Sequence, residues 1–434
     1  MATTIVGKVG LGFENYGDHS SSGYVAGSFL WDNNEYDVPA AAMIHFARTG
    51  DQAALKLGLA SARHYLDVDM IHYARHHPDW GGSFHTHSHS DVGPHTAENP
   101  NMHHAGYVQG LIWYSYFAGD PTGVGGAKSI ADWVLKNLRP ESNTGSMERA
   151  TGHPLMTLTD VYEATGEEQY LRGAAKLVDW AMKWEHPVHS GFLAPITEQP
   201  AYYSGSGFNS GLIEAGLMKF NSWADLPEVD AVLERNARFL LTELWRPPAG
   251  IMSKGGSTSR SANAVHVSSH LRSFRLEYLR TGDPLFLTAP RDMVVAGYGA
   301  KAKEFGSRST GLVYNYLPWY LSMLHDIGDP APDPQVQLTP KDRSCLSIRN
   351  NGTDPIDRVR ISFQPRLDFT VTKAPEIPAS IAPGQTVESC AAFEFPANIN
   401  LTSEYNRVSY AHWGLSFQRA GKLATAHTYI KIEQ

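Results

Sequence analysis

The chain is short of several features that assign proteins to broad classes. Only two of its 434 residues are cysteines, Cys345 and Cys390, and their spacing alone does not show whether they pair. No stretch reaches the ~20 consecutive apolar residues of a membrane span, and the first residues lack the basic segment and apolar run of a signal peptide. These absences disfavour a membrane protein. They indicate either a cytoplasmic protein or the mature or truncated form of a secreted or periplasmic one.

Positive charge is scarce as well. Lys and Arg number 36 against 44 Asp and Glu, so the net charge is -8 and the isoelectric point is about 6.2. No cluster of Lys and Arg interrupts this balance, which disfavours a nucleic-acid-binding surface. The hydrophobic fraction of 42% is typical of a globular protein. The length suits two or three domains of roughly 150 residues, or one large ring with an appendage.

A repeated turn predicts helical hairpins. Glycine ends a helix in the left-handed conformation, and an acidic residue after it favours the first turn of the next helix. Apolar periodicity in 208–220 and 229–241 predicts one more hairpin without this turn. The turn itself occurs at Gly50-Asp51, Gly119-Asp120, Gly166-Glu167 and Gly282-Asp283, with a degenerate copy at Gly328-Asp329.

About six such hairpins between residues 36 and 324 predict a mainly α fold, an (α/α)6 toroid over 31–329. An open solenoid is the alternative, but long loops between the hairpins favour a ring with a cleft at one rim. Residues 1–30 form a glycine-rich lead-in. After a proline-rich linker at 329–334, alternating apolar residues and turn signals predict a C-terminal antiparallel β-sandwich of the immunoglobulin-like kind over 330–434.

Histidine is unusually dense in one segment. Nine of the 20 histidines fall between His72 and His104. In an extended segment His85, His87 and His89 face one way and supply most of a zinc site, or hold a carboxylate; a solvated His-rich loop is the alternative. The adjacent His103 and His104 open a predicted helix, where the helix dipole favours the neutral imidazole that accepts a proton.

Four further groups of residues are candidates for sugar contacts or catalysis. The loop before the first helix offers an aromatic ring and polar groups, although Asp37 and Pro39 also fit a simple helix start. Arg149 suits a carboxylate ligand, although a structural pair with Glu148 or Asp160 is the alternative. The candidates are Trp31, Asp32, Asn33 and Glu35; Arg149 and His153; Tyr202, Tyr203, Lys254 and Arg260; and Tyr314 and Trp319.

Three segments resemble the catalytic domain of the exo-rhamnogalacturonan lyase (YetA-like) family of toroidal polysaccharide lyases. They read WDNNEYDVPAAAMIHFARTGD, NMHHAGYVQGLIWYSYFAGD and ERATGHPLMTLTDVYEATGEEQYL. The resemblance covers about residues 31–329 and implies β-elimination at a uronic acid in an acidic polysaccharide or oligosaccharide.

β-Elimination assigns three tasks to the candidate residues. Arg149 and the histidine run suit neutralisation of the uronate carboxylate. His103 or His104 suits the base that removes the C5 proton, and Tyr202 or Tyr203 suits the acid that protonates the leaving O4. No cofactor is required for this chemistry, although a divalent metal such as Zn or Ca would assist neutralisation of the carboxylate.

Two other functions remain open at this stage. A glycoside hydrolase on the same toroid needs two carboxyl groups. A non-catalytic glycan-binding protein needs neither carboxyls nor a base. The carboxyls available to a hydrolase are Asp32, Glu35, Asp37, Asp160 and Glu214.

Overall fold

A computed structural model describes most of the chain. Its two compact units are unit 1 (1–183, 212–226 and 301–317) and unit 2 (184–211, 227–300 and 318–434). The predicted division into 1–30, 31–329 and 330–434 stays a prediction. The described residues are 20–22, 29–31, 35–85, 100, 102, 107–139, 147–186, 190–192, 194–196, 199–204, 207–247, 250–252, 262–298, 307–395 and 408–433.

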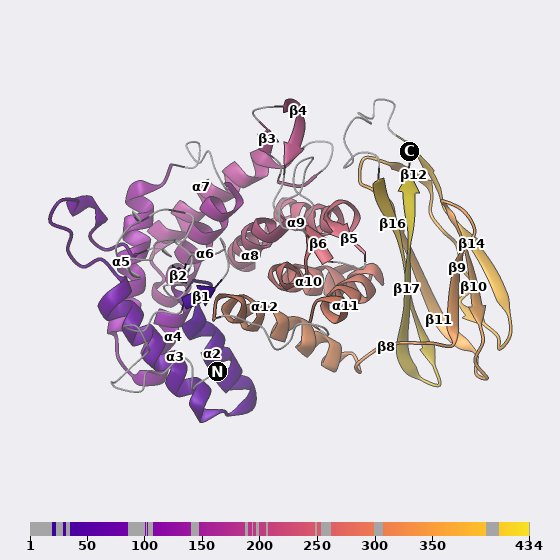
Figure 1. Ribbon diagram of the computed structural model, residues 1–434, viewed down its shortest axis with the longest axis horizontal. Coiled ribbons are helices and arrows are strands. Elements are labelled where there is room, and N and C mark those ends of the chain that lie inside the picture. Colours follow the sequence, from indigo (N-terminus) through magenta and orange to yellow (C-terminus); the bar gives the residue numbers. More distant parts are fainter. Residues whose placement is uncertain are drawn as a thin grey trace. The chain divides into compact units, whose positions relative to one another are not determined.

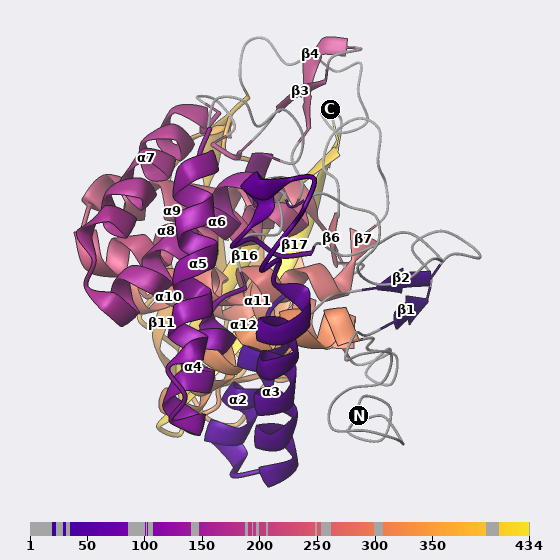
Figure 2. The ribbon, with the colours of Figure 1, turned by 90° about the vertical axis from the view of Figure 1, so that its left-hand side faces the viewer.

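Unit 1 consists mainly of helices that follow one another in pairs, with α4 and α5 beside α6 (Figures 1 and 2). A short antiparallel pair of strands, β1 (Ser20–Ser22) and β2 (Phe29–Trp31), precedes them. The helices are α2 (Val38–Thr49), α3 (Gln52–His64), α4 (Gln109–Ala118), α5 (Thr122–Asn137), α6 (Met147–Thr165) and α7 (Glu168–Trp184), with parts of α8 (Gly207–Ala224) and α12 (Ser307–Asp326).

The glycine turns join helices at four of the five predicted places. Gly50, Gly119, Gly166 and Gly282 all have positive φ and follow the last residue of a helix. The two helices predicted without this turn also exist, since α8 is followed along the chain by α9 (Pro227–Phe239). The prediction at Gly328 is wrong: α12 ends there and the next element is the strand β8 (Ala331–Pro332). Proline at 330 removes a backbone donor and restricts the residue before it, so no helix begins there.

Unit 2 contains the helices α9, α10 (Leu271–Thr281) and α11 (Leu285–Tyr298). Short strands accompany them: β3 (Ala194–Ile196) with β4 (Gln199–Ser204), and β5 (Trp245–Arg246), β6 (Gly250–Met252) and β7 (Ala262–Asn263). Two helices end in a π-helical turn, α3 in unit 1 at η2 (Tyr65–Asp69) and α9 in unit 2 at η6 (Leu240–Leu244). Two 3-10 turns are η3 (Pro78–Trp80) and η7 (Ala264–His270).

The C-terminal β region of unit 2 forms two main sheets in the orders β14-β10-β9 and β13-β11-β16-β17-β8, with a separate pair β12-β15 (Figure 1). Both main sheets contribute to one apolar core around Trp413, Leu346 and Ile356. All pairings are antiparallel except β17 with β8. The strands are β9 (Val336–Pro340), β10 (Cys345–Asn350), β11 (Ile356–Gln364), β12 (Thr370–Lys373), β13 (Ser380–Ile381), β14 (Thr386–Cys390), β15 (Ala392–Glu394), β16 (Val408–Arg419) and β17 (Lys422–Glu433).

The chain is thus mainly helical with a C-terminal β region, as predicted. Among the described residues there are five helix pairs followed by α12. Closure of these helices into an (α/α)6 ring, and the sandwich form of the β region, stay predictions. Within the described parts of the chain no helix is long and apolar enough to cross a membrane.

Candidate active site

A buried polar cluster lies in unit 1 where α2, α4 and α6 begin. The chain enters α2 through Tyr36 and Asp37, which both have positive φ (64° and 55°) although neither is glycine. Such backbone conformations are costly for residues with a side chain and concentrate at functional sites. This entry leaves Glu35 almost fully buried, at 1% exposed.

Glu35 forms an ion pair with Arg149. The Arg149 Nη2 atom lies 2.5 Å from Glu35 Oε1, and the guanidinium lies 5.8 Å from the centre of the Tyr36 ring. Arg149 stands in the first turn of α6, so its charge is held at a helix N-terminus by a carboxylate 114 residues away. The sequence named both residues as site candidates, and the structure brings them together.

Tyr107 and His153 lie beside this pair. The Tyr107 hydroxyl is 3.4 Å from His153 Nε2, and the two rings meet edge to face. Burial, followed by the charge of Glu35, raises the pKa of Tyr107 well above its usual value, against a hydrogen bond with Arg149 that lowers it. The phenol therefore stays protonated at neutral pH. Tyr107 was missed in the sequence, although it lies in the same short segment as His103 and His104.

Asp37 connects the starts of α2 and α4 beside this cluster. Its carboxylate accepts hydrogen bonds from the backbone of Ala40 in α2 and of Gly110 in α4, at 3.1 to 3.2 Å. Asn315 of α12 donates to the carbonyl oxygens of Tyr36 and Asp37. Burial raises the pKa of Asp37 to about 6, although its backbone hydrogen bonds act in the opposite direction. The predicted cap at Asp37 and the first-turn Pro39 are confirmed.

The four carboxyls of the hydrolase alternative that are described all lie inside the protein. Glu35 pairs with Arg149, Asp37 caps a helix, and Asp160 pairs with Lys219. Glu214 is fully buried on α8. Asp32, the fifth, lies outside the described residues.

The remaining candidates are spread over both units. His153 is fully buried, Tyr314 contacts His45 edge to face, and Trp319 is exposed beneath the guanidinium of Arg272. Trp31 lies on β2, and Tyr202 and Tyr203 lie on β4.

Of the proposed metal trio only His85 is described. It is half-buried, and its backbone N–H donates to the carbonyl of Asp69 at 2.7 Å. The trio therefore stays a prediction. The candidates outside the described residues are His87, His89, His103, His104, Asp32, Asn33, Lys254 and Arg260.

No protein-family profile matches the sequence, and no curated protein is similar to it. The resemblance to the exo-rhamnogalacturonan lyases therefore stays a prediction. Solved structures do show similar folds. Cellobiose 2-epimerase from Spirochaeta thermophila matches with a TM-score of 0.51 and 12% identity, over 75% of this chain and 93% of that one.

Two further matches have lower TM-scores. A polysaccharide lyase matches at 0.48 with 11% identity, over 69% of this chain and 91% of that one. A β-arabinofuranosidase matches at 0.47 with 11% identity, over 92% and 84%. The match to the cellobiose 2-epimerase shows that the helical part of the chain shares a fold with an α/α-toroid enzyme.

Proposed function

We propose that the chain is a carbohydrate-active enzyme that cleaves a uronic-acid-containing polysaccharide by β-elimination. The observation that carries this proposal is the meeting of Arg149, Tyr107 and His153 at the start of α4 and α6. A guanidinium that attracts a carboxylate and a phenol that donates a proton are two of the groups that such an elimination needs, and the His153 imidazole contacts the phenol. The fold shared with an epimerase of cellobiose supports a saccharide substrate.

Each group has a defined task in the proposed reaction. The guanidinium of Arg149, oriented by Glu35, attracts the uronate carboxylate and makes the C5–H bond more acidic. A base removes the C5 proton, the electron pair forms the C4–C5 double bond, and the C4–O4 bond breaks. The leaving O4 takes a proton from an acid.

The base and the acid come from a short set of residues. His103 and His104 lie four and three residues before Tyr107 in the chain, so one of them is the proposed base. Tyr107 joins Tyr202 and Tyr203 as a proposed acid, because its protonated hydroxyl lies beside Arg149 and His153. His153 lies within reach of the Tyr107 hydroxyl and orients it.

The hydrolase alternative is disfavoured by the contacts of its carboxyls. A hydrolase places one carboxyl on each side of the glycosidic bond. Glu35, Asp37 and Asp160 instead bind cations or backbone N–H groups inside the protein. A hydrolase on this fold would need carboxyls other than these, such as Asp32, which lies outside the described residues.

A product assay separates the alternatives. The protein is incubated near neutral pH with a panel of uronic-acid polysaccharides, with and without a chelator. Elimination gives a product that absorbs in the ultraviolet, and fragments one water lighter than those of hydrolysis. An epimerase gives an isomer of unchanged mass, and a binding protein gives no product.

Two conservative variants then test the assigned residues. Arg149→Lys keeps the charge but loses the planar fork, and Tyr107→Phe keeps the ring but loses the proton. Each is expected to lower kcat/KM by roughly 10²-fold or more. Arg48→Lys, at an exposed position in the last turn of α2, is the matched control. Full activity in both variants, with unchanged circular dichroism, would contradict their roles.

A further inference from the structure

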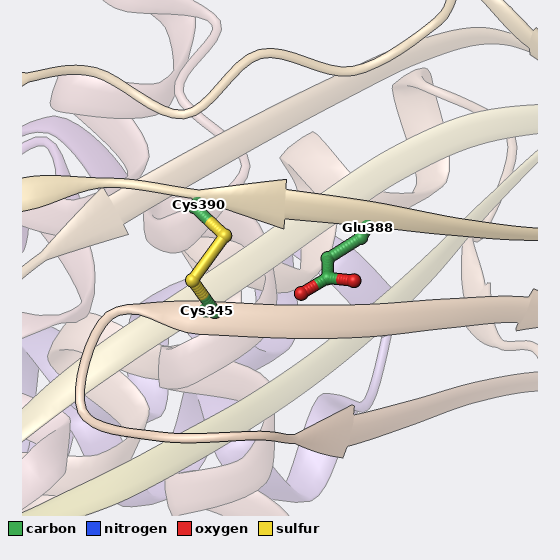
Figure 3. A group of neighbouring side chains, drawn as sticks. All are labelled: Cys345, Glu388 and Cys390. Carbon is green, nitrogen blue, oxygen red and sulfur yellow. A yellow bond between two sulfur atoms is a disulfide. The ribbon is translucent and has the colours of Figure 1, made fainter.

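The two cysteines of the chain lie on the outer face of the three-stranded sheet β14-β10-β9 (Figure 3). Along β10, Leu346 and Ile348 point into the apolar core, so Cys345 points the other way. Cys390 is paired directly across from Cys345 in the antiparallel register, and the two form a disulfide. Both side chains are only partly buried. The disulfide is thus open to solvent and does not belong to the core.

Backbone pairing between β10 and β14 continues on both sides of the disulfide. The register of β10 with β14 continues from Cys345–Cys390 to Arg349–Thr386. On the other side of the disulfide, the backbone of Ala391 donates to Ser344 at 2.8 Å. The two cysteine side chains would therefore still face each other after reduction.

A third potential ligand lies on the same face. Glu388 lies two residues before Cys390 on β14, so both point to the same face of the sheet (Figure 3). It is paired across from Ser347, and its side chain is exposed. The two sulfur atoms and a Glu388 oxygen all lie within 4.8 Å of one another. No other group of three such ligands occurs in the described part of the chain. Glu388 also pairs with Lys341 at 2.9 Å, but exposed ion pairs of this kind are weak.

We propose that this disulfide is reducible in the folded protein and that its two thiolates, with Glu388, then bind one thiophilic divalent cation such as zinc or cadmium. A dithiol reductant supplies two electrons and two protons and is itself oxidised to a disulfide. Each thiol of the chain then releases its proton as its sulfur–metal bond forms.

The geometry suits such a site. Tetrahedral zinc holds its sulfur ligands about 2.3 Å away, which sets the two sulfurs about 3.8 Å apart. Facing cysteines on paired strands reach this separation by rotating their side chains. Two sulfurs and one oxygen leave the fourth position for water on the exposed side. This inference does not rest on the proposed sugar chemistry.

Cadmium titration tests the proposal directly. The folded protein is treated with a phosphine, which takes the oxygen of one water while the disulfide becomes two thiols, and the phosphine is then removed without air. Because the chain has only two cysteines, every sulfur–cadmium absorption band comes from this pair. Cadmium bound only to histidines elsewhere does not give this band. We expect one equivalent of cadmium to produce the band in the reduced protein and none in the oxidised one.

Matched variants complete the test. Cys345→Ser should abolish the band, and Glu388→Gln should weaken cadmium binding roughly tenfold or more. Glu394→Gln, an exposed acid on β15, should leave it unchanged. Three results would each overturn the proposal: a disulfide that resists reduction in the folded state, loss of the β-sheet circular dichroism on reduction, or two free thiols that give no band.

Discussion

At the scale of single residues, Asp37 joins two helices that are distant in the sequence. Its carboxylate accepts from Ala40 at the start of α2 and from Gly110 at the start of α4. A Cβ atom at Gly110 would overlap this carboxylate, so only glycine fits there. This arrangement removes the Asp37 carboxylate from water, which is the main reason for the raised pKa of Asp37.

Asp37 should therefore make the protein less stable as the pH rises. The folded state holds the Asp37 proton up to a pKa of about 6, whereas the unfolded chain releases it near the ordinary aspartate pKa of 3.8. Between these values the folded state binds more protons, so its free energy of unfolding falls with increasing pH, by up to about 3 kcal/mol from this group. Asp37→Asn keeps one acceptor oxygen and removes the titration.

Urea unfolding of both proteins at pH 4, 5, 6 and 7 measures this effect. The difference in unfolding free energy between wild type and Asp37→Asn should shift toward the variant as the pH rises. A difference that stays constant across these pH values would show that Asp37 is already ionised at pH 4 in the folded protein.

The sequence identified several residues of this site but not their contacts. The cap at Asp37 follows from local rules, because a cap needs only its own helix. The pair of Glu35 with Arg149 spans 114 residues, and the local alternatives for Arg149 were Glu148 and Asp160. Tyr107 was missed because its role depends on burial beside His153, which no local pattern encodes.

At the scale of elements, three of the helix pairs share one turn. Thr49, Thr165 and Thr281 each bond through the hydroxyl to a carbonyl four residues back and accept from the backbone of the acidic residue two positions on. The glycine between them has positive φ each time. Asp51 and Asp283 then cap the next helix. The second turn, at Gly119, lacks this threonine.

Two glycines of the second helix pair separate backbone strain from packing. Gly119 has a φ of +68° and Gly125 lies inside α5, and neither has a neighbour within 4 Å of an added Cβ atom. Gly119→Ala should lower the free energy of unfolding by about 1 kcal/mol, since left-handed backbone disfavours a side chain. Gly125→Ala should raise it by roughly 0.5–1 kcal/mol, since alanine favours helix. Equal effects of the two variants in urea unfolding would contradict this difference.

The turn pattern predicted the helices well because it is local. It failed at Gly328, where the same glycine and acid are followed by Pro330 and a strand. The π-helical turns at Tyr65–Asp69 and Leu240–Leu244 were not predicted at all. A π turn differs from an α turn by one residue in its hydrogen bonds, and apolar periodicity does not resolve that difference.

At the scale of the whole molecule, the β region of unit 2 packs against helical segments of the same unit. Trp245 stacks on the rings of His412 from β16 and His427 from β17. His427 Nδ1 lies 2.6 Å from the carboxylate of Asp292 on α11, and His412 Nδ1 lies 3.4 Å from His427 Nε2. A Cβ at Gly414 would meet the Leu285 backbone at 3.0 Å. The sequence patterns distinguished a helical part from a β part, but they do not predict contacts between residues more than a hundred positions apart.

This contact should make unit 2 sensitive to acid. Burial, and then the neighbouring His427, hold the pKa of His412 well below its usual value of 6.5. Below pH 6.5 the unfolded chain binds a proton at His412 that the folded state does not bind. The free energy of unfolding therefore falls by about 1.4 kcal/mol for each unit by which the pH is lowered.

His412→Asn keeps a hydrogen-bonding group and removes the titration, at the cost of the ring stacked on Trp245. It should be less stable than wild type at pH 8 and lose less stability toward pH 5, whereas His325→Asn, at an 80% exposed position, should follow wild type. If His412→Asn loses stability with acid as steeply as wild type, groups other than His412 set the acid response.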